Sequence, residues 1–393
     1  MAEDPVALRR FAFCQDGHLA LLDGHMPDED CKLLRNILAS AHLNVLLGSA
    51  FSIEVVPTLE NRESWFCAVE SKIAGNQDET VWSDVLRILK AEYFRSVMLP
   101  LDGAGPTNGQ IAAINALLGL VRNRGTATIP KRINLFTTNY DPLIERSLEK
   151  GLVSYNDGFV GREHPVFDSS AYSRLQYEQS LFMEYTSQVV TANVIKPHGS
   201  LTWRRGENEV EYSTADETLK ACLDGCADIL NLLVLDEARE LVRCDCDDSR
   251  IVRLEDASRA LNPADQALLT RFENQYDSTL CIVNPTKRKF EETLLERSYY
   301  DLLRIYANEL DRNNALLLVF GFSFADEHIR DLTVRAAKSN PKLIILISCY
   351  SSSAADNFEQ LFLGCENVVL LVPEDGENLG LDVFARSLTW LSR

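Results

Sequence analysis

The sequence predicts an α/β protein with a Rossmann-like, doubly wound parallel sheet and a helical insertion. Three observations support this prediction: short continuous apolar runs, helical patterns between them, and small or polar residues directly after several runs. Continuous apolar runs are typical of strands buried on both faces, and their alternation with helices indicates parallel pairing. In such a sheet, ligands bind beyond the carboxyl ends of the strands.

The strands are clearest in the last third of the chain. Helical patterns that begin near Asp326 and near Ser352 separate three apolar runs there, and similar runs occur earlier. The predicted strands are 44–47, 133–137, 280–283, 315–320, 342–348 and 367–372, with a further short run at 193–195. Each of the first three ends in small or polar residues, so we expect those residues at the ligand-binding edge of the sheet.

The remaining segments divide the chain into an N-terminal arm or hairpin, residues 1–27, and one large domain, residues 28–393. Asp16-Gly17 is a dipeptide favoured in tight hairpin turns. Periodic apolar positions predict a mainly helical insertion at about 55–130, and an acidic, irregular insertion follows at about 200–275. We expect both insertions to cover the cleft or to form contacts.

Composition limits the classes of partner. The 393 residues are 46% hydrophobic and 25% charged, as in ordinary globular proteins. With 58 acidic and 39 basic side chains the formal charge is −19, which disfavours non-specific binding to the phosphate backbone of nucleic acids. Nucleic acid is therefore expected only through a complex, whereas the excess of acid would suit a basic protein partner.

The compartment expected from the sequence is the cytoplasm. No stretch approaches the roughly 20 apolar residues that span a bilayer, so no membrane contact is expected. The acidic start Met1-Ala2-Glu3-Asp4 lacks the apolar core of a secretory signal. The ten cysteines are scattered, as is common for reduced thiols in that compartment.

Two glycine-containing loops follow predicted strands. In Gly48-Ser49-Ala50-Phe51-Ser52, small residues allow a pyrophosphate to approach the backbone, whose amides can hold its charge. In Gly321-Phe322-Ser323, the glycine permits close approach of a ligand and the serine offers a hydroxyl. A simple tight turn is the alternative interpretation of such loops.

Polar residues that are suited to ligand binding or proton transfer follow two further runs. Asn139 can donate to and accept from ribose hydroxyls or a positioned water, whereas Asp141, followed by proline, is better explained as a helix N-cap. His198, beside a glycine at a strand end, is placed for proton transfer near neutral pH, with a purely structural histidine as the alternative. Asp326 is interpreted as an N-cap, and His328 as a packing or capping residue.

Together these segments resemble the sirtuin family. Gly48-Ser49-Ala50-Phe51-Ser52 is similar to their Gly-Ala-Gly-x-Ser loop, which holds NAD phosphates. Thr138-Asn139-Tyr140-Asp141 is similar to their Thr-Gln-Asn-x-Asp, whose Asn lies at the nicotinamide ribose, and His198-Gly199 to their catalytic His-Gly. Gly321-Phe322-Ser323 resembles the Gly-Thr-Ser that meets the adenosine half, and Asn284 the later Asn that contacts the adenosine ribose.

The departures from the family concern the loop and the metal. Ala50 replaces a glycine, which narrows the phosphate loop. Protein-deacylating sirtuins carry two Cys-x-x-Cys pairs that bind structural zinc, but the nearest clusters here are Cys222 with Cys226 and Cys244 with Cys246. These spacings do not make a zinc ribbon, so no metal is expected and deacylation is in doubt.

Without a zinc ribbon, the set of motifs resembles that of the bacterial sirtuin-like effectors of antiviral defence. Their Asp-Gly-Phe and Gly-Tyr-Ser-Phe-x-Asp-x-His motifs are similar to Asp157-Gly158-Phe159 and to residues 321–328. The resemblance implies a hydrolase that cleaves NAD, as substrate, to nicotinamide and ADP-ribose and so depletes it. It also implies the stand-alone member that pairs with a HerA-type ATPase, with homo-oligomeric rings of both proteins.

In this interpretation Asn139 holds the ribose hydroxyls or the attacking water, and His198 acts as general base on one or the other. Three alternatives stay open. They are an NAD-dependent protein deacylase, a non-catalytic sensor of NAD or ADP-ribose, and a nuclease acting within the ATPase complex.

Overall fold

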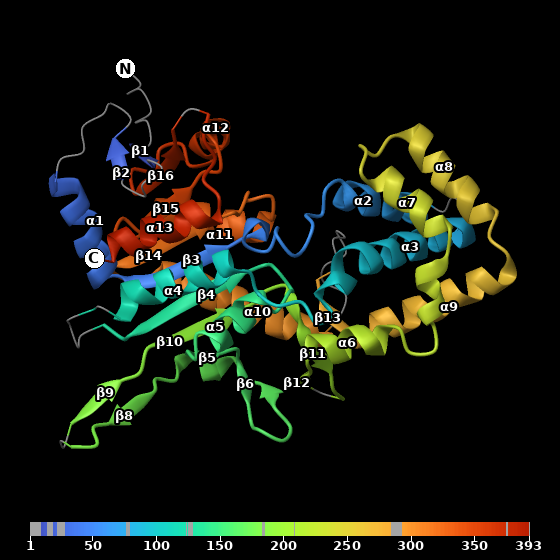
Figure 1. Ribbon diagram of the computed structural model, residues 1–393. Coiled ribbons are helices and arrows are strands. Elements are labelled where there is room, and N and C mark those ends of the chain that lie inside the picture. Colours follow the sequence, from blue (N-terminus) through green and yellow to red (C-terminus); the bar gives the residue numbers. More distant parts are fainter. Residues whose placement is uncertain are drawn as a thin grey trace.

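A mixed sheet lies at the centre of the structure, between two layers of helices (Figure 1). The computed structural model describes residues 9–13, 19–21, 28–75, 79–122, 124, 129–182, 185–207, 209–283, 293–374 and 376–392. Among them, nine strands form this sheet in the order β2-β1-β16-β15-β14-β3-β4-β10-β5. All neighbours pair in parallel except β2, which runs antiparallel to β1 at the edge. The predicted Rossmann-like α/β class is confirmed.

Six strands of this sheet agree closely with the predicted apolar runs. They are β3 (His42–Leu47), β4 (Arg132–Thr137), β10 (Thr191–Ile195), β14 (Ala315–Phe320), β15 (Ile344–Ser348) and β16 (Val368–Pro373). The other three are β1 (Arg9–Phe13) and β2 (Leu19–Leu21), from the N-terminal segment, and β5 (Ser154–Asn156), which was not predicted. The N-terminal segment thus contributes β1 to the central sheet, while Asp16-Gly17 lies outside the described residues.

Burial on both faces explains why these strands are continuously apolar. Leu316 and Leu318 of β14 pack into one hydrophobic cluster and Leu317 and Val319 into another, on opposite faces. The first cluster is covered by α1 (Asp28–Ser40), α4 (Asn108–Arg122), α5 (Leu143–Lys150) and α13 (Leu381–Leu391). The second is covered by α10 (Thr293–Leu310), α11 (Glu327–Ser339) and α12 (Ser352–Leu361).

Three buried asparagines interrupt the apolar runs at one level of the sheet. Asn44, Asn134 and Asn193 face one another across β3, β4 and β10. The amide of Asn134 donates to Asn44 Oδ1 at 2.9 Å, and that of Asn193 donates to Asn134 Oδ1 at 2.9 Å. Because buried amides are costly without partners, this ladder favours one register of the three strands.

The strand order reverses between β3 and β14. From β3 the chain continues outward through β4 and β10, whereas β14, β15 and β16 extend the sheet on the other side. The register pairs Leu47 with both Phe320 and Thr137, so these strands end at the same level. Such a switch point creates a crevice at the carboxyl edge of the sheet.

A second, antiparallel sheet lies beside the first. Its order is β13-β11-β12-β7-β6, formed by β6 (Phe159–Val160), β7 (Val166–Phe167), β11 (Gly199–Arg205), β12 (Val210–Tyr212) and β13 (Leu280–Ile282). The prediction that residues 280–283 join the parallel sheet is therefore wrong. The run pairs antiparallel with β11, because so short an apolar run fits either kind of buried strand. A separate hairpin is formed by β8 (Tyr177–Gln179) and β9 (Thr186–Gln188).

A helical lobe stands at one side of the sheets (Figure 1). It combines α2 (Arg62–Ala74) and α3 (Glu79–Tyr93) with α6 (Ala215–Cys222), α7 (Val234–Val242), α8 (Asp248–Arg259) and α9 (Pro263–Thr279). After α3 the chain continues through a π-turn, Phe94–Met98, and a 3₁₀ turn, Leu99–Leu101. Glu273 of α9 binds Arg87 at 2.7 Å and Lys90 at 3.0 Å, which joins it to α3.

The structure corrects both predicted insertions. Residues 200–275 are not irregular after their first hairpin, because most of the remainder forms helices of the lobe. The helical stretch 55–130 is divided, since α4 covers the central sheet and packs against α13, whereas α2 and α3 belong to the lobe.

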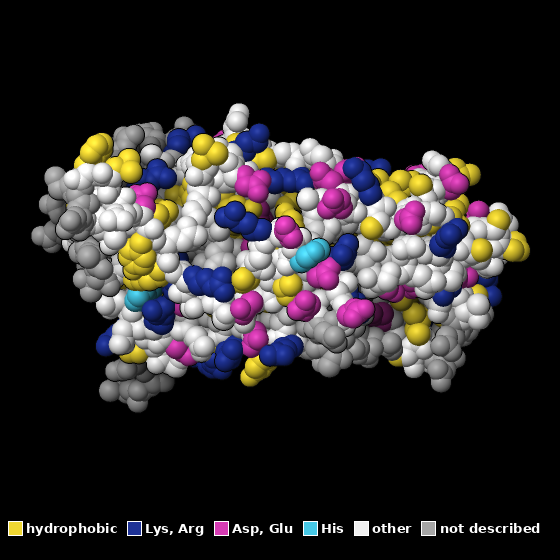
Figure 2. Space-filling view, turned by 90° about the horizontal axis from the view of Figure 1, so that it is seen from below, with side chains coloured by type: hydrophobic (Ala, Val, Ile, Leu, Met, Phe, Trp, Pro, Cys, Tyr) yellow, Lys and Arg dark blue, Asp and Glu magenta, His cyan; other side chains and the backbone are white. Residues whose placement is uncertain are grey.

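On the face shown in Figure 2, acidic and basic side chains are interspersed, and no continuous basic area is visible.

Candidate functional site

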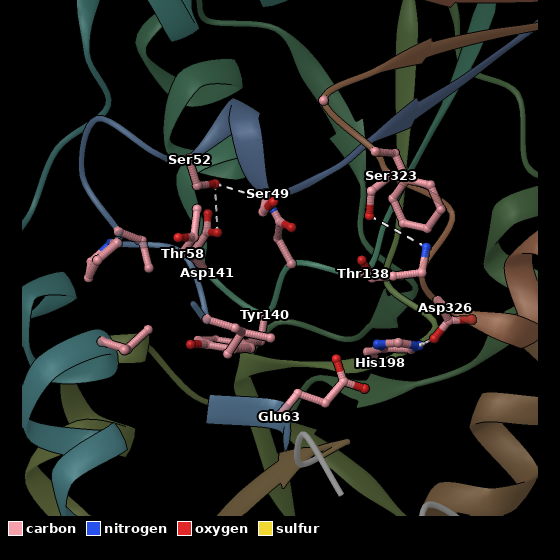
Figure 3. A pocket seen from close by; sticks show the side chains of 18 of the residues that line it. Ser49, Ser52, Thr58, Glu63, Thr138, Tyr140, Asp141, His198, Ser323 and Asp326 are labelled. Atoms are coloured by element: carbon pink, nitrogen blue, oxygen red, sulfur yellow. Dashed lines mark hydrogen bonds and ion pairs between the residues drawn. The ribbon is translucent and has the colours of Figure 1, made fainter. Parts of the chain in front are cut away.

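One cavity lies at the carboxyl ends of β3, β4, β10 and β14, where the helical lobe meets the sheet (Figure 3). The sequence-predicted residues that line it are Ser49, Ser52, Thr138, Asn139, Asp141, His198, Gly321 and Ser323. Gly48 and Ala50 do not line it, and Asn284 lies outside the described residues. Residues from four separate loops are thus brought to one place, as expected for this edge of the sheet.

The two glycines are required by the contact between loops. Gly48 donates its amide to Phe320 at 2.9 Å, and a Cβ at position 48 would lie 2.1 Å from the carbonyl oxygen of Gly321. Gly321 has φ +65, and a Cβ there would lie 2.4 Å from that of Ala50. Their missing side chains therefore let β3 and β14 end side by side. Ser49, which is exposed, and Ser52, which is buried, are the residues of the first loop that line the cavity.

Asn139 is fixed by the first loop. Its Nδ2 donates to the carbonyl oxygen of Gly48 at 3.0 Å and to Ser52 Oγ at 3.1 Å. Ser52 Oγ in turn donates to Asp141 Oδ2 at 2.7 Å, so it can only accept from the asparagine. This network orients the amide, and no described residue donates to Asn139 Oδ1, which remains an acceptor for a ligand.

The N-cap of α5 is Pro142 rather than the predicted Asp141, but the Asp141 side chain still accepts a hydrogen bond at the start of this helix and belongs to the same network. Its Oδ1 accepts from the amide of Leu143 at 3.0 Å, at the start of the helix. Its carbonyl oxygen accepts from Nζ of Lys196 at 2.6 Å. Lys196 also forms a buried ion pair with Glu145 Oε1 at 2.6 Å, which fastens the end of β10 to α5 beneath the cavity. Burial raises the pKa of Glu145 above its ordinary value.

His198 and Asp326 form a pair at one end of the cavity (Figure 3). Nε2 of His198 lies 3.0 Å from Oδ2 of Asp326, with 13% and 9% of the two side chains exposed. The other oxygen of Asp326 caps α11 by accepting from the amide of Ile329 at 2.9 Å, which confirms the predicted N-cap. The ring of Tyr299 is stacked on His198 at 5.9 Å between centroids. A neighbouring carboxylate of this kind fixes an imidazole in one orientation.

Aromatic packing holds the loop after β14 in a strained conformation. Phe324 has φ +59, a left-handed conformation that costs a non-glycine residue about 1–3 kcal/mol. Its ring packs edge-on against Phe322 at 5.1 Å and Phe362 at 5.4 Å between centroids. The packed Phe324 ring fixes the loop so that the exposed Ser323 lines the cavity and Asp326 lies next to His198. His328 of the same segment packs edge-on against Tyr299 at 6.3 Å.

The opposite wall was not found from the sequence. It is formed by the segment before α2 and by the helical lobe, through Val56, Pro57, Thr58, Leu59, Glu63, Tyr93 and Val97. Tyr93 donates to the hydroxyl of Tyr140 at 2.8 Å, which links the lobe to the loop after β4. No short motif marks these residues, since only tertiary packing places them at the cavity.

Asp157-Gly158-Phe159 has a structural explanation away from the cavity. Asp157 Oδ1 accepts from the amide of Phe159 at 3.1 Å, and Gly158 has φ +89. A Cβ on Gly158 would lie 2.5 Å from the ring of Phe167. The motif therefore forms a turn that enters the second sheet.

The cysteine clusters do not join the site. Cys222 and Cys226 are buried in the helical lobe, Cys246 is half-buried and Cys244 is exposed. Within the residues that the structure describes, no group of three or more His, Cys, Asp or Glu side chains is arranged to hold a metal ion. In the same part of the chain, no helix combines the length and the apolar character needed to span a bilayer.

Comparison with known proteins gives no relative from which roles could be transferred. No protein-family model matches the chain, and no curated protein matches it significantly. The chemistry of the site is therefore inferred from its own geometry and from the motifs described above.

Proposed function

We propose that the cavity binds NAD and that the protein hydrolyses the nicotinamide–ribose bond, releasing nicotinamide and ADP-ribose. The observation that carries the proposal is the meeting of an oriented asparagine, Asn139, with the carboxylate-paired His198 in one cavity at the switch point of the sheet. Doubly wound sheets bind nucleotides at such a point. Ser49 and Ser323, on either side of the glycine contact, supply hydroxyls for the phosphates and the adenosine half.

Nicotinamide leaves NAD as a neutral molecule, so the barrier lies in the cationic ribose left behind. Oδ1 of Asn139 accepts from a ribose hydroxyl or from the attacking water. His198, whose Nε2 lies 3.0 Å from Oδ2 of Asp326, takes a proton from that hydroxyl or water through its other ring nitrogen. Binding of the phosphates and adenosine contributes energy that strains the bond to be broken.

The direct test is incubation of the purified protein with NAD, followed by quantification of nicotinamide and ADP-ribose by chromatography. We expect both products in equal amounts and a loss of at least about 10²-fold in rate for His198→Ala, as for removal of a general base. His164→Ala, which removes an exposed histidine outside the cavity, is the matched control and should retain full activity. Absence of products from the wild type, alone and with its partner ATPase, would refute the proposal.

We further propose that the protein works in the cytoplasm as a homo-oligomer that binds a HerA-type ATPase, with NAD hydrolysis altered in the complex. An NAD hydrolase harms its own cell unless its activity is controlled by a partner. Closed rings repeat one interface without leaving open ends. The hairpin β8–β9 supports such assembly, because it carries the exposed apolar side chains Leu181, Phe182 and Tyr185.

A further inference from the structure

Among the described residues, three carboxylates line the cavity, and two of them already contact other groups of the site. Asp141 accepts from Leu143 and Ser52 through its two oxygens. Asp326 caps α11 with one oxygen and faces His198 with the other. Neither carboxylate can rotate toward a substrate without losing one of these contacts, which hold the loops of the site.

Glu63 is the third carboxylate, and it differs from the other two. It lies in the first turn of α2, is exposed, and is directed into the cavity on the side of Tyr140 and His198 (Figure 3). Among the described residues, none donates a hydrogen bond or forms an ion pair with it. Its charge is therefore available to whatever occupies the cavity.

The neighbouring cation does not neutralise Glu63. Arg62 is buried and binds Glu92 at 2.8 Å and Glu60 at 3.2 Å. A glutamate in the first turn also interacts favourably with the helix dipole, but any position of that turn would give this effect. The location of Glu63 at the cavity is what calls for an explanation.

We infer that Glu63 is a catalytic carboxylate that stabilises the cationic ribose formed when NAD is cleaved. This inference rests on the proposed NAD hydrolysis. The bond between ribose C1′ and the nicotinamide nitrogen breaks, and its electron pair leaves with neutral nicotinamide. Water then adds to C1′, a proton passes to His198, and the product is ADP-ribose. Glu63 faces the charge that develops at C1′, and the substrate excludes the water that would otherwise screen it.

In this mechanism the helical lobe supplies a catalytic group. The central sheet supplies the loops that hold the nucleotide and the base, whereas α2 supplies the anion from the opposite wall. A carboxylate that acts on developing charge should affect turnover more than substrate binding.

The test compares Glu63→Gln with Glu54→Gln, which alters an exposed glutamate of the neighbouring segment that does not line the cavity. We expect Glu63→Gln to lower kcat about 10²–10³-fold, the usual loss for one electrostatic group at a developing charge. KM for NAD and Kd for ADP-ribose should change less than about twofold, since the charge acts in the transition state. Glu54→Gln should behave as wild type, and neither exposed substitution should change Tm.

Two results would overturn the inference while leaving the proposed function intact. One is a kcat of Glu63→Gln within about threefold of wild type. The other is a loss of ADP-ribose affinity that equals the loss of kcat, which would make Glu63 a binding residue. A wild-type protein that fails to cleave NAD with or without its ATPase would overturn both, so the two failures are distinguishable.

Discussion

At Asp326 a single carboxylate serves two elements. One oxygen caps α11 and the other faces Nε2 of His198. The sequence identifies the cap, because Asp followed by a helical pattern is a strong local signal. It gives no sign of the contact with His198, which depends on folding of distant segments. The residue's contribution to stability and its contribution to the site can therefore be separated by substitution.

We predict that Asp326→Asn lowers kcat for NAD about 10²–10⁴-fold with little change in Tm or KM. Asparagine retains an oxygen that can cap α11, but it removes the charge that holds the imidazole of His198. Asp326→Ala should also lower stability by about 1 kcal/mol through loss of the cap. Steady-state kinetics, thermal unfolding and ¹⁵N NMR of the His198 tautomer measure these effects. An unchanged tautomer and kcat in Asp326→Asn would show that Asp326 acts only as a cap.

The same contrast holds for other residues of the cavity. Asn139 and His198 could be chosen from the sequence because each follows an apolar run where a doubly wound sheet exposes its loops. Glu63 and Tyr93 could not, since both lie in helices whose sequence carries no local mark of the site. Gly48 and Gly321 were predicted as points of ligand approach, whereas the structure shows that their closest neighbours are each other's loops.

The end of β10 and the start of α5 are joined by the buried ion pair of Lys196 and Glu145, at 2.6 Å. Burial raises the pKa of Glu145 above its ordinary 4.5, and Lys196 opposes that effect. A carboxyl whose pKa rises on folding binds its proton more tightly in the folded state. The stability it contributes therefore falls as pH rises from the ordinary value through the raised one.

We predict that Lys196→Met lowers the free energy of unfolding by about 3–5 kcal/mol at pH 7, because it leaves the Glu145 carboxylate buried without a cation. The loss should shrink as pH falls from 7 to 5, because the raised pKa of Glu145 favours its neutral form. Urea unfolding at several pH values measures both effects. In the double variant Lys196→Met, Glu145→Gln, most stability should return and the pH dependence should flatten. An equal loss at pH 5 and pH 7 would contradict this account.

Elements were predictable where local pattern determines them. The runs of β14, β15 and β16 are long, apolar and buried on both faces, so their class and pairing follow from sequence. The three-residue β13 has the same composition but joins the antiparallel sheet. Helices α6 to α9 were missed because they lie in an acidic stretch for which no regular structure was predicted. They are stabilised by packing in the helical lobe, and ion pairs join α9 to α3, which lies far away in the chain.

At the scale of the whole molecule, segments from different parts of the chain form each side of the cavity. The parallel sheet holds the loops after β3, β4, β10 and β14, and the lobe built around α2 and α3 closes the opposite wall. The sequence indicates a mainly helical stretch at about 55–130 and an acidic, irregular one at about 200–275, but not that parts of the two pack together. That arrangement depends on long-range contacts, which no local pattern encodes.

The hairpin β8–β9 is the apolar feature of the surface that most needs a partner. Leu181 and Phe182 at its tip are 92% and 93% exposed, and a two-stranded hairpin is only marginally stable alone. None of its residues lines the cavity. If homo-oligomers form, burial of this tip against a second copy would stabilise both the hairpin and the assembly.

We predict that Leu181→Ser combined with Phe182→Ser reduces the oligomer to smaller species in light scattering at micromolar concentration. Burying each side chain contributes about 1.5–3 kcal/mol, so losing both should weaken association at least about 10²-fold. Leu233→Ser, which alters an 83% exposed leucine on the helical lobe, is the control and should leave the mass unchanged. NAD hydrolysis by the separated chains should persist, because the cavity lies elsewhere. A double variant with wild-type mass would exclude the hairpin from the interface between copies.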